Sequence, residues 1–351
     1  MELLEKTLRC IGSLDAGAME ACRRRLDSLT KPPGSLGMLE EIAVKLAGIT
    51  GKMPPEVREK VVLVMAGDHG VASEGVSAYP PEVTGQMVLN FLREGAAINV
   101  LARHAGAKVV VTDVGVAGDL VHPGLRMAKI RKGTANMAVG PAMSREEAVA
   151  CIEAGIRAVS DEIDRGAQIV GTGDMGIGNT TASTAILAAA GGMPVSQVTG
   201  RGTGVDEAKL LRKVDIIERA LAVNRPDPSD PIDILAKVGG LEIGAIAGTI
   251  LGAGARRVPA VVDGFISTAG ALIAARLCAR VTDFMMASHL SEEPGHRIAL
   301  DLIGLEPVLR MKMRLGEGTG AALSFHLIDA SVRILMEMAT FDDAGVSGRS
   351  S

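Results

Sequence analysis

A glycine-rich stretch near the middle of the chain has the composition of a phosphate-binding turn. It spans Gly171 to Thr181 (GTGDMGIGNTT), follows an apolar segment and precedes a helix-like segment over 182–190. Glycines let the backbone approach an anion closely, and the first unpaired N–H groups of a helix point toward it. The stretch lacks the lysine of a Walker A motif. It contains the pattern G-x-G-x-x-G, but the strand ending in an acidic residue that follows about 20 residues later in dinucleotide-binding domains is not evident here. The pattern therefore favours a phosphate-bearing substrate over a dinucleotide.

Two further glycine loops precede expected helices. Residues 199–204 (TGRGTG) come before a helix expected over 206–221, and residues 316–320 (GEGTG) come before one from residue 321. Tight turns alone would explain one such loop, but three in one chain predict an extended site for a phosphate or nucleotide. Lys213 lies on the helix after the second loop and is a candidate charge for a phosphate, although a lone helical lysine is more often solvated.

Glu317 is a carboxylate held between two glycines at the start of a helix. Glycine neighbours let a substrate approach without obstruction, so Glu317 is a candidate general base. An acid near a helix N-terminus also offsets the helix dipole, and spacing alone leaves both interpretations open.

His69, His289 and His296 raise the question of a metal site. No H-x-x-x-H or H-E-x-x-H spacing occurs, and the four cysteines are scattered without C-x-x-C spacing. We therefore expect no metal ion, no cofactor, and reduced thiols in a cytoplasmic protein. No G-x-S-x-G motif is present, which leaves hydrolysis by a serine nucleophile unsupported.

Composition excludes several partners. The 351 residues carry a net charge of -4, no Trp, one Tyr and five Phe, so stacking on nucleic-acid bases is not expected. No apolar stretch approaches the roughly 18 residues of a membrane span. The longest candidate, 243–255, is rich in glycine and reads as a closely packed buried helix.

The elements that must position these residues follow two patterns. Residues 2–50 show helical periodicity, whereas short β-branched runs alternate with helical segments from about 57 to 290, which predicts an α/β fold with a largely parallel sheet. We expect the strands at 61–65, 108–112, 168–171, 260–262 and 283–287. Polar residues follow them, namely Asp68, His69, Asp113, Asp174, Asp263, Ser288 and His289. Because ligands bind beyond the carboxyl ends of parallel strands, these side chains are expected to converge.

Both ends of the chain share helical character. We expect residues 1–55 and 296–345 to form a small helical domain, residues 56–295 to form the large α/β domain, and residues 346–351 to be a disordered tail.

Six ordered motifs closely resemble those of the nicotinate-nucleotide–dimethylbenzimidazole phosphoribosyltransferases of cobalamin biosynthesis. They are residues 30–37 (TKPPGSLG), 66–71 (AGDHGV), 83–87 (VTGQM), 175–181 (MGIGNTT), 202–204 (GTG) and the segment 288–296 (SHLSEEPGH), and the resemblance covers about residues 20–340. It implies a homodimer with a Rossmann-like domain and a small helical domain. It also implies transfer of the 5-phosphoribosyl group of nicotinate mononucleotide to 5,6-dimethylbenzimidazole, giving α-ribazole 5′-phosphate and nicotinate.

The resemblance also implies roles for individual residues. Glu317 matches the family's catalytic base, and Asp174 is a candidate to stabilise positive charge on the ribose. The chain departs from the family here, because relatives commonly have Glu at the position of Asp174. The expected substrate-binding residues are Ser77, Tyr79, Pro80, Gln86, Gly176, Ile177, Gly178, Asn179, Thr180, Arg201, Gly202, Thr203, Gly204, Lys213, Asp263, Ser288, His289, Ser291, Leu315, Gly316, Gly318 and Gly320.

Two other functions remain open from the sequence. A nucleotide-binding oxidoreductase would use the G-x-G-x-x-G to bind NAD. A non-catalytic nucleotide sensor would bind ligand through the phosphate loops and would not need Glu317.

Overall fold

The computed structural model describes residues 1–202, 204 and 206–347. Its centre is a six-stranded sheet in which every neighbouring pair is parallel, with the order β3-β2-β1-β4-β5-β6. The strands are β1 (Lys60–Gly67), β2 (Ala107–Gly115), β3 (Leu125–Met127), β4 (Ile169–Met175), β5 (Ala260–Val262) and β6 (Met285–Ala287). The predicted α/β, Rossmann-like class is confirmed, and the strand order reverses between β1 and β4, where ligands bind in doubly wound sheets.

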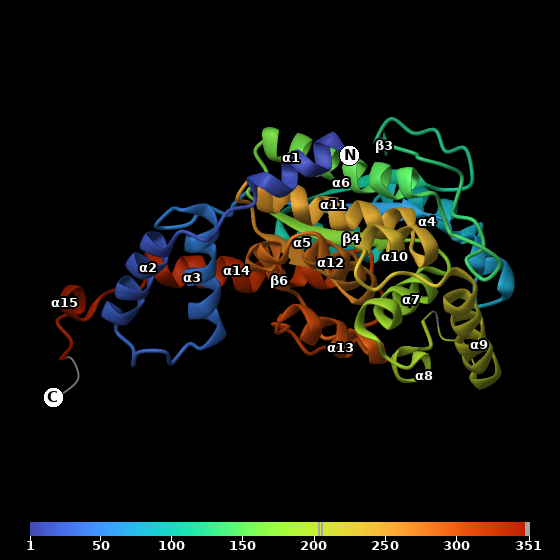
Figure 1. Ribbon diagram of the computed structural model, residues 1–351. Coiled ribbons are helices and arrows are strands. Elements are labelled where there is room, and N and C mark those ends of the chain that lie inside the picture. Colours follow the sequence, from blue (N-terminus) through green and yellow to red (C-terminus); the bar gives the residue numbers. More distant parts are fainter. Residues whose placement is uncertain (203, 205, 348–351) are drawn as a thin grey trace.

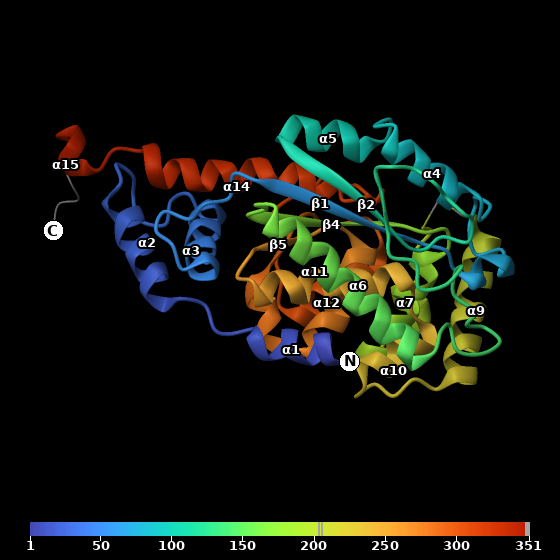
Figure 2. The same cartoon turned by 90° about the horizontal axis from the view of Figure 1, so that it is seen from above.

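Helices cover both faces of this sheet. Those that follow the α/β pattern of the sequence are α4 (Val83–Leu92), α5 (Ala97–Ala105), α6 (Arg145–Asp164), α7 (Asn179–Gly191), α8 (Val195–Val198), α9 (Glu207–Asn224), α10 (Pro231–Val238), α11 (Leu241–Ala255) and α12 (Phe265–Leu277), with 3₁₀ helices η1 (Gly70–Glu74) and η2 (Ala279–Phe284). Figure 2 shows α4, α5 and α14 (Thr319–Glu337) on one side of the sheet and α6, α11, α12 and α7 on the other.

Successive side chains of β1 point to opposite faces of the sheet, which explains why a layer of helices packs on each face. Val61, Leu63 and Met65 belong to the apolar core beneath α6 and α11, whereas Val62 and Val64 belong to the core beneath α5 and α14. A strand buried on both faces reads as a continuous apolar run, which is the pattern from residue 61 to 66.

A smaller helical lobe extends from this body (Figure 1). It contains α2 (Ala16–Ser28), α3 (Met38–Thr50), the end of α14 and α15 (Phe341–Ala344). Cys22, Leu26 and Leu29 form an apolar cluster with Ala43 and Leu335, so both chain ends contribute to its core.

Two helices within the ranges expected for the small domain pack on the α/β body instead. α1 (Glu2–Cys10) contacts α6 and α11, and α13 (Pro294–Ile303) contacts α7, α8 and α12. The reason is the apolar face of each helix, because Leu4 of α1 and Leu300 of α13 join the core cluster of the body. The division into domains as a whole remains a prediction.

Within the described residues, no helix combines the length and apolar character needed to cross a membrane.

Candidate active site

A cavity of about 530 Å³ lies at the carboxyl edge of the sheet, which is a volume typical of small-molecule sites. It is bounded by the turn after β4, the segment after β6 and the start of α14. Its lining includes residues expected from the sequence, namely Tyr79, Asp174, Gly176, Ile177, Asn179, Thr180, Gly202, His289, Ser291, Leu315, Gly316 and Glu317. Residues far apart in the chain are therefore brought together at one site.

Glu317 occupies this cavity in an unusual backbone conformation. Its φ is 65°, and those of Gly316 and Gly318 are 84° and 94°, so three successive residues are left-handed. A non-glycine residue held in this region stores strain and is typical of functional sites. The side chain is 7% exposed, and its Oε2 accepts a hydrogen bond from the Ile98 N–H at 3.4 Å. The loop thus presents one carboxylate to the cavity.

Burial raises the pKa of Glu317 to about 7; the Ile98 N–H opposes that rise and the nearby Asp263 adds to it. A carboxyl group with this pKa exchanges a proton near neutral pH, which suits a general base.

Asp263 holds the start of α14 and therefore the position of Glu317. Its two carboxylate oxygens accept hydrogen bonds from the N–H groups of Gly318 at 3.1 Å, Gly320 at 2.7 Å and Ala321 at 3.1 Å. Burial raises its pKa, while His289 opposes the rise. The side chain does not line the cavity, so the structure places Asp263 behind the predicted site.

The glycines of β4 make room for the Glu317 loop. A Cβ atom on Gly173 would lie 2.5 Å from the Glu317 carbonyl oxygen. Gly171 and Gly173 therefore belong to the strand and not to the turn that follows it. The literal G-x-G-x-x-G is consequently no dinucleotide fingerprint, because that motif needs its glycines in the turn.

Replacing Gly173 with alanine should push the Glu317 loop away from β4. We expect kcat/KM to fall at least tenfold, and overpacking to lower the free energy of unfolding by about 1–3 kcal/mol. Steady-state kinetics and urea unfolding measure both. Gly12→Ala is the control, since a Cβ there meets nothing within 4 Å. Unchanged kinetics in Gly173→Ala would show that this clearance is not needed.

The turn after β4 leads into α7 through a left-handed glycine. Gly178 has a φ of 97° and is the N-cap of α7, without a side-chain cap. The Ile177 N–H is already used by Thr84 Oγ1 at 3.1 Å. Lys213 Nζ donates to Thr180 Oγ1 at 2.8 Å and to the Gly200 carbonyl at 3.3 Å. An ammonium has three donors, so one remains for an anion near this turn.

Lys213 is buried behind Thr180 and Gly202 and does not itself line the cavity. Burial lowers its pKa to about 8, and Glu293 opposes that shift.

Asp174 is the second-last residue of β4 and lies beside the Glu317 loop. Its Oδ2 accepts a hydrogen bond from Asn179 Nδ2 at 3.0 Å, whereas Oδ1 is buried without a hydrogen-bond partner among the described residues. Burial, followed by the negative charges of Asp263 and Glu242, raises the pKa of Asp174 well above its usual value. A cationic group placed in the cavity would favour its ionised form.

The two histidines after β6, His289 and His296, are held in place by hydrogen bonds. His296 Nδ1 accepts from the Ser291 N–H at 2.8 Å, and its Nε2 is 2.9 Å from Thr268 Oγ1. Burial lowers the pKa of His296 to about 3, so its ring is neutral. His289 Nδ1 lies 3.1 Å from Ser288 Oγ, which also donates to the Asp263 carbonyl oxygen. These contacts give the motif over 288–296 a positioning role.

The polar residues that follow the strands do not all converge. Asp174 and His289 reach the cavity. Asp68 Oδ2 instead accepts from the Ala117 N–H at 2.7 Å, and Asp113 Oδ1 accepts from the Gly115 and Val116 N–H groups. Asp68 and Asp113 therefore shape loops.

Several residues expected to bind substrate lie outside the cavity lining. They are Ser77, Pro80, Gln86, Gly178, Arg201, Gly204, Lys213, Asp263, Ser288, Gly318 and Gly320, and Thr203 is not among the described residues. Gln86 is exposed on α4, and Val83 and Met87, one helical turn apart, line the cavity in its place.

The sequence did not single out Glu293 and Arg314, which also line the cavity. Glu293 Oε1 accepts from the Gly202 N–H at 2.9 Å, and Arg314 donates to the Gly202 carbonyl at 3.1 Å. Glu293 lies within the motif over 288–296 and Arg314 lies just before the loop over 316–320, and these positions were the available signal.

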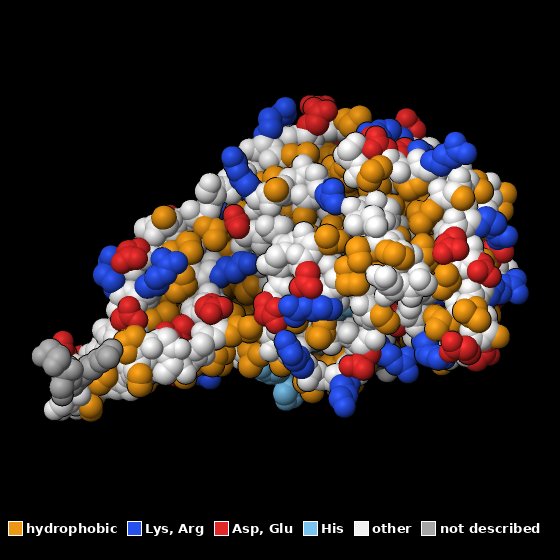
Figure 3. Space-filling view, turned by 60° about the horizontal axis from the view of Figure 1, so that its bottom comes forward, with side chains coloured by type: hydrophobic (Ala, Val, Ile, Leu, Met, Phe, Trp, Pro, Cys, Tyr) orange, Lys and Arg blue, Asp and Glu red, His pale blue; other side chains and the backbone are white. Residues whose placement is uncertain are grey.

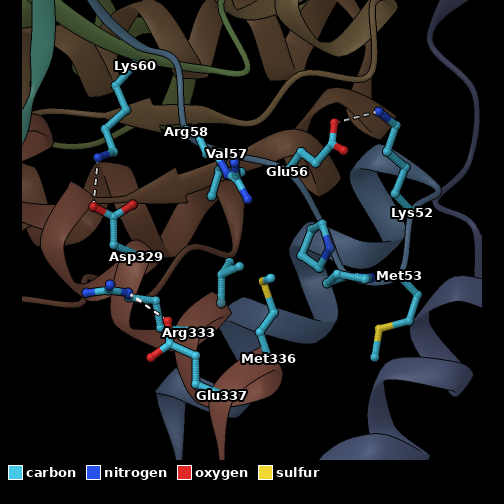
Figure 4. A pocket seen from close by; sticks show the side chains of 13 residues that line it. Lys52, Met53, Glu56, Val57, Arg58, Lys60, Asp329, Arg333, Met336 and Glu337 are labelled. Atoms are coloured by element: carbon cyan, nitrogen blue, oxygen red, sulfur yellow. Dashed lines mark hydrogen bonds and ion pairs between the residues drawn. The ribbon is translucent and has the colours of Figure 1, made fainter.

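A larger cavity, about 780 Å³, lies at the opposite edge of the sheet (Figure 4). It is lined by residues 52–58, which precede β1, and by the end of α14. Most of its charged side chains are already paired, Lys52 with Glu56, Lys60 with Asp329 and Arg333 with Glu337. Ligands bind at the carboxyl ends of parallel strands, so the smaller cavity is the candidate active site.

No group of three or more His, Cys, Asp or Glu side chains among the described residues could hold a metal ion.

The pKa values of Glu317 and Lys213 predict a bell-shaped pH dependence of kcat/KM. Below about 7, Glu317 is protonated and cannot act as a base. Above about 8, Lys213 loses the charge that favours a phosphate. Because kcat/KM reports the free enzyme, rates across pH 5–10 should fall on both sides of this interval. A profile flat from pH 5 to 7 would contradict the assignment of Glu317.

The chain is similar to known proteins along almost its whole length. A family model described as Phosphoribosyltransferase matches residues 11–346. Proteins named nicotinate-nucleotide–dimethylbenzimidazole phosphoribosyltransferase are similar throughout. The one from Desulforamulus reducens is 59% identical, covering 99% of each chain, and the one from Geobacter sulfurreducens is 58% identical, also covering 99% of each.

Solved structures are similar as well. The crystal structure of the enzyme of that name from Thermus thermophilus has 50% sequence identity and a TM-score of 0.91, covering 96% of this chain and 100% of that one. A structure described as CobT from the same organism has 52% identity and a TM-score of 0.91, covering 95% of this chain and 100% of that one.

Proposed function

Because this chain belongs to the phosphoribosyltransferase family, we propose that it transfers the 5-phosphoribosyl group of nicotinate mononucleotide to 5,6-dimethylbenzimidazole. The products are α-ribazole 5′-phosphate and nicotinate. The observation that supports this proposal is that Glu317 lines the same cavity as Gly176, Ile177, Asn179 and Thr180 of the turn after β4. Such a cavity suits a pair of substrates, one that carries a phosphate and one that loses a proton.

Glu317 is the general base of the proposed transfer. Its carboxylate takes the N–H proton of the benzimidazole, and the other ring nitrogen forms a bond to C1′ of the ribose. The bond from C1′ to the pyridinium nitrogen breaks, and its electron pair neutralises the nicotinate ring. The leaving group therefore needs no proton, and attack from the opposite face converts a β-nucleotide into an α-nucleotide.

Orientation and charge supply the rest of the catalysis. The protein holds the two rings on opposite faces of C1′ and so turns a bimolecular step into an intramolecular one. Positive charge grows on the ribose in the transition state, and the ionised form of Asp174 stabilises it. The buried Oδ1 of Asp174, without a hydrogen-bond partner among the described residues, is available for that contact.

Two alternative functions are less well supported. Two of the three glycines that an NAD-dependent oxidoreductase would need in its turn, Gly171 and Gly173, lie within β4. A nucleotide sensor would not need a strained, buried Glu317 with a pKa of about 7.

Product analysis tests the proposed reaction. Purified protein is incubated with nicotinate mononucleotide and 5,6-dimethylbenzimidazole, and the products are separated by chromatography and identified by mass spectrometry. We expect nicotinate and α-ribazole 5′-phosphate in equal amounts. Release of nicotinate without the second product would indicate hydrolysis, and no product would rule out this pair of substrates.

The homodimer, the cytoplasmic location and the boundaries of the two domains remain proposals. Support for self-association comes from apolar side chains exposed on the helical lobe, which include Met38 at 36% and Met336 at 48%. Figure 3 shows this lobe projecting from the body, with hydrophobic and charged side chains intermixed. Sedimentation at micromolar concentration should give twice the mass of one chain, and a stable monomer would contradict the proposal.

A further inference from the structure

The motif over 66–71 contains a buried histidine that does not line the active-site cavity. His69 Nε2 lies 2.6 Å from Glu242 Oε1. The side chains are 1% and 0% exposed, and Glu242 Oε2 has no hydrogen-bond partner among the described residues. A charged pair withdrawn from water in this way is costly to bury, and leaving one partner alone costs more. Stability alone is therefore a weak reason for its presence.

The pair lies directly beneath the turn that follows β4. A Cβ on Gly176 would be 3.3 Å from His69 Nε2 and 3.4 Å from Glu242 Oε1, and it would also collide with the Gly67 carbonyl oxygen. A Cβ on Gly178 would be 3.3 Å from the His69 Cβ. Both glycines thus rest against the pair, and this turn is where the substrate phosphate is expected.

We propose that His69 and Glu242 are positioning residues that fix the phosphate-binding turn over 176–179 from below. This inference rests on the proposed function, because it assigns the turn to the phosphate of nicotinate mononucleotide. The pair connects the end of β1 to the start of α11. Close packing of His69 and Glu242 against Gly176, and of His69 against Gly178, holds the backbone N–H groups of the turn in their direction toward the anion.

Neighbouring carboxylates favour the protonated form of His69. Burial alone would lower the pKa of His69, but the carboxylate of Glu242, with a contribution from Asp68, raises it overall. Burial raises the pKa of Asp174 and of Cys151, and the carboxylate of Glu242 adds to both rises. Acidic side chains thus gather around His69 beneath the turn, and protonation of its ring would offset them close to a site that must accept a phosphate.

Glu242→Gln tests the inference because it retains the side-chain shape and removes the charge. We expect KM for nicotinate mononucleotide to rise about tenfold, with kcat and the KM for the base within about threefold of wild type. A higher KM with a nearly unchanged kcat means that the variant has lost binding energy that the ground state and the transition state share. His69→Gln should give the same split. The double variant should be no worse than the worse single variant, because the two residues act as a unit.

Glu162→Gln is the matched control. Glu162 is also a buried carboxylate, paired with Lys108 at 2.7 Å, but it lies on α6 away from the cavity. It should lower the melting temperature without raising KM. A folded Glu242→Gln variant with wild-type KM, or an equal rise in KM in Glu162→Gln, would overturn the inference. Absence of turnover in wild-type protein would instead refute the proposed function.

Discussion

Replacing Glu317 with glutamine is expected to lower kcat by about 10²–10⁴-fold, the usual contribution of a general base. Glutamine can still accept the hydrogen bond from the Ile98 N–H that Glu317 accepts at 3.4 Å. It cannot take a proton from the benzimidazole. The left-handed turn around residue 317 should persist, because Asp263 still holds the N–H groups of Gly318 and Gly320. Initial rates at saturating concentrations of both substrates measure the loss.

Binding separates loss of chemistry from loss of structure in this variant. Calorimetric titration with nicotinate mononucleotide should give a dissociation constant within about threefold of wild type. The acid limb of the pH profile should disappear from the residual activity. A Glu317→Gln variant with wild-type kcat would remove Glu317 from the mechanism and would favour a different proton acceptor in the cavity.

Replacing Lys213 with methionine should produce the second largest effect. Methionine occupies much of the same buried space but removes the ammonium that donates to Thr180 Oγ1 and the Gly200 carbonyl. Hydrogen bonds to charged groups contribute about 1.5–3 kcal/mol, which corresponds to a loss in kcat/KM of about 10–150-fold. Most of the loss should appear as a higher KM for nicotinate mononucleotide, and the alkaline limb near pH 8 should vanish.

Lys209→Met is the matched control, since Lys209 lies one turn earlier on α9 and is exposed. It should leave both kinetic constants within about twofold of wild type. Equal losses in the two variants would mean that net charge, and not the position of Lys213, determines phosphate binding. A Lys213→Met variant that raises KM for the base alone would place the phosphate elsewhere.

The fold was predictable from the sequence to the extent that its strands are apolar runs. Such runs identified β1 and the three-residue β5 (Ala260–Val262), whereas β3 (Leu125–Met127) carries Arg126 at its centre and was not recognised. The expected strand over 283–287 began too early, because Asp283 belongs to the 3₁₀ helix η2. Short elements depend on tertiary contacts, which local sequence does not encode.

The candidate site was predictable where glycines mark special backbone geometry. The loop around Glu317 is the clearest instance, since its left-handed conformation requires the flanking glycines. Lys213 was harder, because an isolated helical lysine is usually solvated. Lys213 lies three, four and seven residues before Ile216, Ile217 and Ala220, which are buried on one face of α9. This helical spacing was the signal that Lys213 is buried as well.

Contacts between distant segments could not be read from local patterns. Glu242, in an apolar helix, meets His69 across 173 residues of sequence. Glu293 meets Gly202 across 91 residues. Contacts between residues so far apart in the chain produce no periodic pattern in the sequence.

A crystal structure with nicotinate mononucleotide and 5,6-dimethylbenzimidazole bound to Glu317→Gln tests the central claim most directly. The account predicts the phosphate against the turn over 176–180 and a benzimidazole nitrogen within hydrogen-bond distance of residue 317. Both ligands should lie in the cavity of about 530 Å³ at the carboxyl edge of the sheet. Ligands bound instead in the cavity between residues 52–58 and the end of α14 would contradict it.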